Sequence, residues 1–138
     1  MELFVGTDIV EVKRIQRAYE KNPKFLEKLF TAKEVEYFNS KKSKFQSVAG
    51  FFSAKESVSK VLGTGISGFR WKDIEIAHDE KGAPVVILKG KAKEAAGHKG
   101  IKTIKLSISH TKDYAVSFAV GIGGEKNDSV DVKTNERS

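Results

Sequence analysis

One long apolar segment constrains the fold of this chain more than any other feature. Residues 44–62 place apolar side chains at helical spacing, about 100° per residue around a helical wheel. The main apolar arc consists of Phe51, Ala54, Val58, Val61 and Leu62. Gly63 and Gly65 follow directly, and glycine accepts the positive φ that ends a helix. The segment therefore predicts one long helix with a broad buried face.

Shorter helices and several strands are expected on both sides of this helix in the sequence. Strands are expected at residues 2–12, 74–76, 85–88, 104–108 and 114–120. Shorter helices are expected from residue 11, from Pro23, from residue 31 and over 91–97. The first strand has apolar residues on both pleat faces, which predicts a strand buried on both sides. Strands and helices do not alternate as in βαβ units, so the prediction is the α+β class, with a mainly antiparallel sheet packed on one long helix and several short helices. We expect one domain over residues 1–122 and a flexible tail over 123–138, where apolar periodicity is lost.

Composition limits the class of protein and its partners. The net charge of +7 is consistent both with a polyanionic partner and with an ordinary basic surface. The 138 residues include no cysteine, which excludes disulfides and thiolate chemistry and fits a cytoplasmic protein. No apolar run reaches the roughly 20 residues of a membrane helix, so no membrane partner is expected.

Two carboxylates and one lysine are the strongest candidates for chemistry. Asp8 lies near the end of an apolar strand, and Glu56 lies at the margin of the apolar arc, with Lys60 four residues further on the same side. A carboxylate that is removed from water needs a cation or hydrogen-bond donors. Simpler interpretations are also open, because Asp8 can cap the next helix and Glu56 can form an ordinary pair with Lys60, worth about 0.3 kcal/mol. Lys55 falls within the apolar arc, from which a long side chain can extend its ammonium group to water.

Further candidates surround the end of the long helix and an expected hairpin tip. Gly63, Thr64 and Gly65 follow Lys60, and a cation beside exposed backbone N–H groups can hold a phosphate. A helix cap followed by a turn is the simpler interpretation of the three residues. His110 can contact an anion or relay a proton, or it can be an exposed turn histidine.

A cationic stripe lies on the first expected helix. Arg14, Arg17 and Lys21 follow one another at i, i+3 and i+7, which places them on one side of a helix. Such a stripe can dock an acidic helix or a nucleic-acid backbone. An ordinary solvated face is the alternative.

Taken together, five motifs in this chain resemble those of the holo-[acyl-carrier-protein] synthases, the small bacterial type of 4′-phosphopantetheinyl transferase. The motifs are GTDIVEVKRI (6–15), FFSAKESVSKVLGTGI (51–66), WKDIEI (71–76), KGAP (81–84) and SHTKDYAVS (109–117). The resemblance covers about residues 1–122. It implies the fold of these transferases, magnesium as cofactor, and a homotrimer whose active sites lie between subunits.

The resemblance also implies an activity and the residues that perform it. The 4′-phosphopantetheine arm of coenzyme A would be transferred to a serine of acyl carrier protein, for fatty acid synthesis, with release of adenosine 3′,5′-bisphosphate. Asp8 and Glu56 would bind magnesium, and Lys60 would assist catalysis beside them. The residues implied to bind coenzyme A are Lys60, Gly63, Thr64, Gly65, Ser109, His110 and Thr111. Arg14, Arg17 and Lys21 would face the carrier protein.

One departure from the family pattern concerns coenzyme binding. Relatives often have a basic residue where this chain has Phe51, so a coenzyme contact from that side chain would be lost. The candidates to replace it are Lys44, Lys55 or a lysine elsewhere.

Two other functions remain alternatives at this point. A basic module that binds nucleic acid fits the net charge, although no zinc motif, RRM-like aromatic pattern or helix-turn-helix is evident, and nucleic acid is therefore not the expected partner. A small coenzyme A-dependent acyltransferase would act on the thioester and would need no magnesium bound by carboxylates.

Overall fold

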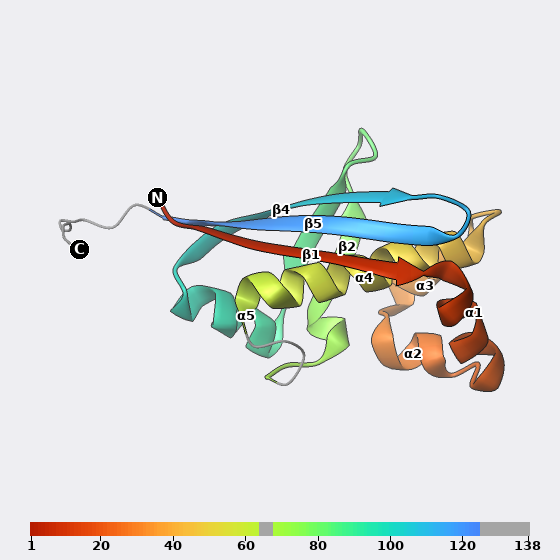
Figure 1. Ribbon diagram of the computed structural model, residues 1–138. Helices are drawn as coiled ribbons and strands as arrows, with labels where there is room; N and C mark the ends of the chain where they lie inside the picture. The colour runs from red at the N-terminus through yellow and green to blue at the C-terminus, as the bar shows by residue number, and fades with distance from the viewer. Residues whose placement is uncertain (64–67, 125–138) are drawn as a thin grey trace.

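The computed structural model describes residues 1–63 and 68–124, which form five strands, five α-helices and one short 3₁₀-helix. In chain order the elements are β1 (Leu3–Glu11), α1 (Val12–Lys21), α2 (Phe25–Leu29), α3 (Ala32–Asn39), α4 (Lys44–Leu62), the 3₁₀-helix Trp71–Asp73, β2 (Ile74–His78), β3 (Pro84–Leu88), α5 (Gly90–His98), β4 (Ile101–His110) and β5 (Tyr114–Gly123) (Figure 1). Residues 64–67 and 125–138 lie outside the description. They include Thr64, Gly65 and most of the predicted tail, so the domain boundary stays a prediction.

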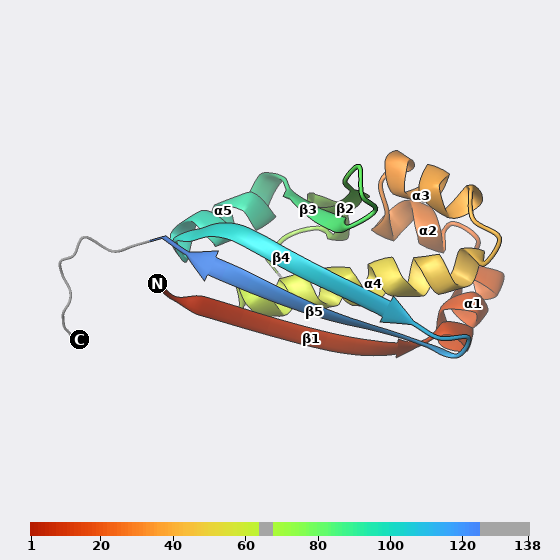
Figure 2. The ribbon, with the colours of Figure 1, turned by 90° about the horizontal axis from the view of Figure 1, so that it is seen from above.

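Two antiparallel sheets account for the described strands. The larger sheet has the order β1-β5-β4, and the smaller one is the hairpin β2-β3. Helix α4 runs beneath the larger sheet (Figure 1), while the hairpin, α2 and α3 lie on the side of α4 that faces away from β1 (Figure 2). The α+β prediction with one central helix is confirmed.

Helix α4 has the predicted bounds because its two signals are local. Its apolar arc is buried, including Phe51, Ala54 and Val58. Gly63 ends the helix with a φ of +84°, in the left-handed region that favours glycine. None of the described helices combines the length and the apolar composition that a membrane crossing requires.

The larger sheet approaches α4 unusually closely at two glycines. A Cβ atom at Gly6 in β1 would lie 2.1 Å from the carbonyl oxygen of Ser57, and one at Gly121 in β5 would lie 2.6 Å from the side chain of Val61. Both separations are far inside van der Waals contact, so only glycine permits this packing. The close approach brings the backbone of β1 within reach of polar side chains on α4.

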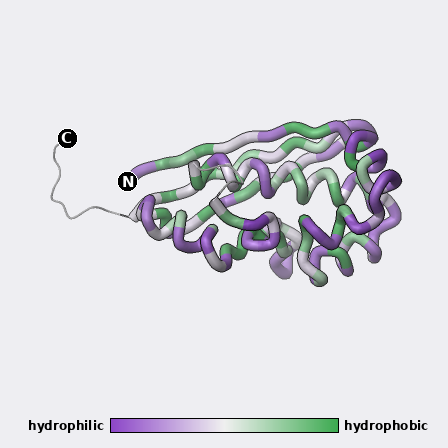
Figure 3. Tube along the Cα trace, turned by 90° about the horizontal axis from the view of Figure 1, so that it is seen from below, coloured by the Kyte–Doolittle hydropathy of each residue, from purple (hydrophilic) through white to green (hydrophobic). Residues whose placement is uncertain are grey.

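The outer face of the larger sheet is apolar and exposed, and this corrects the prediction that the first strand is buried on both sides. Apolar segments run along β1 from the N mark (Figure 3), yet Leu3, Val5 and Ile9 are 60%, 60% and 65% exposed. The prediction failed because no described element of the chain covers this face. On β5, Val116 and Phe118 continue the apolar surface.

A buried ion pair ties α4 to the opposite layer. The sequence allowed Lys55 to extend its ammonium group to solvent, but it does not do so. Its side chain and that of Glu34 are both 0% exposed. Its ammonium group donates to Glu34 Oε1 at 2.8 Å, to the carbonyl of Leu29 at 2.9 Å and to that of Trp71 at 3.1 Å. All three protons of the ammonium group therefore have acceptors. Glu34 also accepts from the backbone N–H groups of Thr31 and Ile76, each at 2.8 Å.

Candidate active site

Asp8 and Glu56 are brought together where β1 crosses α4. The Ser53 hydroxyl donates to the backbone carbonyl of Asp8 at 3.0 Å, and Lys60 Nζ lies 3.8 Å from Asp8 Oδ1. Lys60 also donates to the carbonyl of Thr7 at 2.8 Å. Positions 53, 56 and 60 lie on one side of a helix, so Glu56 lies between the two residues of α4 that hold Asp8.

Burial raises the pKa of both carboxylates, and the charge of Asp8 adds to the effect on Glu56. Partial burial raises the pKa of Asp8, while the charge of Lys60, the nearby hydroxyl of Ser53 and the charge of Arg14 oppose the rise. Burial also raises the pKa of Glu56, and the negative charge of Asp8 raises it further against Lys60 and Arg14. In both cases the upward effects prevail, so the two nearby cations do not fully compensate the pair.

The donor set at this point fits a hard divalent cation. Asp8 and Glu56 offer carboxylate oxygens, which Mg²⁺ prefers, and Mg²⁺ commonly takes one or two protein carboxylates and completes its shell with water and substrate phosphate. Within residues 1–63 and 68–124, no group of three or more His, Cys, Asp or Glu side chains could enclose a metal. A cation here would therefore depend on oxygens from water or substrate beside those of the pair.

The end of α4 next to this pair is cationic. Lys60 lies in the last turn of α4, and its side chain is 53% exposed, so it can reach an anion in solvent. Lys99 Nζ donates to the carbonyl of Val61 at 3.2 Å and lies against Gly63. Sequence analysis missed Lys99, because nothing in the local pattern connects α5 with the end of α4.

The predicted residues of the β4–β5 turn belong to a different part of the surface. Ser109 and His110 end β4, and the Thr111 hydroxyl accepts from the backbone N–H groups of Asp113 and Tyr114 at 3.3 and 3.1 Å. His110 lines a pocket of about 140 Å³. The pocket is formed with Tyr37, Ser47, Gly50, Phe51, His78, Gly82, Pro84 and Ile108. Neither Asp8 nor Glu56 lines it, so one chain presents two separate parts of the predicted site.

The burial of Lys55 rules out one replacement for the basic side chain that is missing at Phe51. Phe51 is buried and stacks on Tyr37 with 5.2 Å between ring centroids. Lys55 cannot take over a coenzyme contact, because it is fully buried and committed to Glu34. Lys44, the other named candidate, lies over the ring of Tyr19 at 5.1 Å.

The cationic stripe is exposed along α1. Arg17 lies 3.5 Å from Glu11, and Lys21 occupies the last turn. Arg14 has a second effect that the sequence did not reveal, since its charge acts on both Asp8 and Glu56. The stripe thus begins beside the carboxylates and leads away from them.

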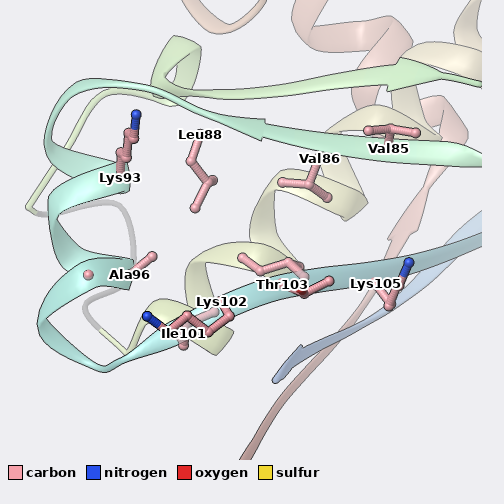
Figure 4. A pocket seen from close by; sticks show the side chains of 11 residues that line it. Val85, Val86, Leu88, Lys93, Ala96, Ile101, Lys102, Thr103 and Lys105 are labelled. Atoms are coloured by element: carbon pink, nitrogen blue, oxygen red, sulfur yellow. The ribbon is translucent and has the colours of Figure 1, made fainter. Parts of the chain in front are cut away.

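A further cavity of about 540 Å³ contains none of the predicted site residues. It lies between β3, α5 and β4 (Figure 4). Apolar side chains such as Val86, Leu88 and Ile104 line it, together with Lys93 and Lys105. Neither Asp8 nor Glu56 lines it.

Comparison with known proteins identifies the class to which this fold and site belong. A family model described as the 4′-phosphopantetheinyl transferase superfamily matches residues 4–119, and the chain belongs to this superfamily. A holo-[acyl-carrier-protein] synthase of Thermoanaerobacter sp. (strain X514) is 75% identical over 138 residues, which is all of both chains. Within the superfamily the chain is therefore an enzyme of the holo-[acyl-carrier-protein] synthase kind, as the sequence motifs predicted.

Solved structures agree with this assignment. The holo-[acyl-carrier-protein] synthase of Neisseria meningitidis is 31% identical and superposes with a TM-score of 0.80, covering 86% of this chain and 97% of its own. The synthase of Helicobacter pylori, solved in complex with coenzyme A, is 33% identical with a TM-score of 0.76 and covers 86% and 99%. The predicted transferase fold is confirmed.

Proposed function

We propose that this enzyme transfers the 4′-phosphopantetheine group of coenzyme A to a serine of acyl carrier protein, with magnesium as cofactor and for use in fatty acid synthesis. The observation that carries the proposal is the meeting of Asp8 and Glu56 beside Lys60, since the two carboxylates are 48 positions apart in the sequence. The coenzyme A complex of the Helicobacter pylori relative supports the choice of donor substrate.

The residues of this chain have distinct tasks in the transfer. The serine hydroxyl attacks the β-phosphate of coenzyme A, and the bond from that phosphorus to the oxygen that bridges the two phosphates breaks, releasing adenosine 3′,5′-bisphosphate. Asp8 and Glu56 would hold Mg²⁺, which supplies charge neutralisation on the diphosphate when bound. Lys60 neutralises the negative charge that grows on the leaving bisphosphate. An oxygen of one of these carboxylates, or a water molecule beside them, takes the hydroxyl proton.

We further propose that the enzyme works as a homotrimer with sites between subunits. The exposed apolar face of β1 and β5 supports assembly, because contiguous apolar surface of this kind marks interfaces. The two separate parts of the site support a shared location, in which the carboxylates of one subunit face the His110 pocket of the next. The number three comes from the family resemblance.

The cationic stripe on α1 is the proposed docking face for acyl carrier protein. Arg14, Arg17 and Lys21 present positive charge on one exposed face, which would attract an acidic helix and increase the association rate at low salt. Because the stripe begins at Arg14, next to the carboxylates, a carrier protein docked there would hold its serine near Glu56.

Cytoplasm remains the expected location of the enzyme.

Mass spectrometry of apo-acyl carrier protein tests the proposal directly. The carrier is incubated with enzyme, Mg²⁺ and coenzyme A, and we expect a mass increase equal to one phosphopantetheine group. The Glu56→Gln variant is the matched control, since it preserves shape and removes charge. No adduct with the wild-type enzyme would refute the activity. Transfer that persists in EDTA would refute the role of magnesium and favour a coenzyme A-dependent acyltransferase, whereas tight nucleic acid binding without coenzyme A binding would favour a basic module.

A further inference from the structure

Three serine hydroxyl groups are enclosed between α4 and β5, directly behind the carboxylate site. Ser53 and Ser57 come from α4 and Ser117 from β5, and their exposed fractions are 0%, 0% and 2%. Neighbouring positions in the same layer are apolar, for example Ala54 and Ala119. A buried hydroxyl group without a partner costs free energy that alanine would not, so the three serines need an explanation.

The hydroxyl groups form a chain that ends at Asp8. The hydroxyl of Ser57 contacts the hydroxyl of Ser117, and it also lies 3.3 Å from the carbonyl oxygen of Ser117. The hydroxyls of Ser117 and Ser53 are 2.8 Å apart, and Ser53 donates to the carbonyl of Asp8 at 3.0 Å. Each hydroxyl has one proton to donate, and a consistent order runs from Ser57 to Ser117, then to Ser53 and finally to Asp8.

The pairing of β1 with β5 places the row of hydroxyl groups next to Asp8. Asp8 and Ser117 are opposite each other in the β1–β5 pair, so the serine cluster lies on the same rung of the sheet as the carboxylate. The Thr7 hydroxyl adds a second link by donating to the carbonyl of Ser117 at 2.9 Å. Ser53 thus connects β1 to α4 three residues before Glu56.

We infer that Ser53 is a positioning residue that holds Asp8 at the right place relative to Glu56 for both carboxylates to bind one divalent cation. Ser57 and Ser117 fix the orientation of the Ser53 hydroxyl. The inference rests on the proposed function, and it adds residues that touch neither substrate nor metal. Groups that orient metal ligands typically change metal affinity by 10–100-fold when they are removed.

Mn²⁺ binding, followed by electron paramagnetic resonance with coenzyme A present, tests this role without relying on turnover. We expect Ser53→Ala to weaken Mn²⁺ binding about tenfold and to raise the Mg²⁺ concentration for half-maximal activity by a similar factor. The KM for acyl carrier protein should stay unchanged. Ser59→Ala is the matched control, because Ser59 is also buried in α4 but donates only to the carbonyl of Glu56 within its own helix, at 2.7 Å.

A second variant keeps the test decisive if Ser53→Ala folds poorly. Ser117→Ala removes the hydroxyl that contacts the Ser53 hydroxyl from β5. Like Ser53→Ala, it should weaken Mn²⁺ binding. Combined with Ser53→Ala, its effect should be less than the product of the two single effects. Wild-type Mn²⁺ affinity in both single variants would overturn the inference and leave the proposed function intact. Absence of Mn²⁺ binding to the wild-type enzyme would instead overturn the proposed metal site, and the inference with it.

Discussion

The ion pair between Lys55 and Glu34 leads to a strong prediction about stability. The two groups are 2.8 Å apart and neither side chain is exposed. In the Glu34→Gln variant, the ammonium of Lys55 keeps the carbonyls of Leu29 and Trp71 but loses its negative partner. In the Lys55→Met variant, the carboxylate of Glu34 keeps two backbone N–H donors but loses its positive partner. Each variant leaves one charge buried without compensation.

The size of the effect follows from this burial. Breaking a buried ion pair by removing one partner costs about 3–5 kcal/mol, which is a large share of the roughly 5–15 kcal/mol that stabilises a typical domain. The double variant leaves no unpaired charge, because both members are neutral. We therefore expect the double variant to lose less stability than the two single variants added together. The difference should be about 2–3 kcal/mol in the free energy of unfolding.

Urea unfolding followed by circular dichroism at one fixed protein concentration measures these differences. Lys60→Met is the control, since it removes a lysine from the same helix whose side chain is half-exposed and lies 3.8 Å from its acidic partner. A half-exposed pair of this kind is worth less than about 1 kcal/mol. The reasoning would be refuted if Lys55→Met cost no more than Lys60→Met, or if the two single losses were simply additive.

Four other predictions concern the site and the surfaces around it. Gly6→Ala should destabilise the fold by about 1–3 kcal/mol in the same urea assay, because the added Cβ would overlap the carbonyl of Ser57; unchanged stability would show that β1 can move away from α4. Glu56→Gln should abolish magnesium-dependent transfer yet raise the melting temperature of the metal-free protein at neutral pH, since the raised pKa means that the charged form opposes folding. This gain should disappear as the pH is lowered through the raised pKa, and a lower melting temperature at neutral pH would contradict the sign. Lys21→Glu should raise the KM for acyl carrier protein at low salt while the KM for coenzyme A stays constant; equal changes in both would remove α1 from the docking face. Phe118→Glu should yield monomers in size-exclusion chromatography with light scattering, together with loss of transfer, whereas an intact oligomer would move the interface elsewhere.

Local signals in the sequence predicted the bounds of α4 and the start of α3, whereas β4 begins three residues before its predicted start. The apolar arc and Gly63 give α4 its bounds, and Thr31 with Glu34 forms the capping box at the start of α3. These features depend on residues within a few positions of each other, so helical geometry alone predicts them. The motifs also identified the family correctly, because they place Asp8 and the Glu56–Lys60 pair in a recognisable order.

Only the tertiary structure decided what each buried or exposed residue contacts. Lys55 appeared able to extend to solvent, but Glu34, 21 positions away, and two carbonyl groups enclose it. Val5 appeared to belong to a strand buried on both sides, yet it lies on an open face. Ser53 gave no signal at all, because its hydroxyl partner Ser117 lies on a strand 64 positions later. Periodicity along a chain shows which residues share a face, whereas the partner of that face depends on how distant segments pack, and no local pattern contains that information.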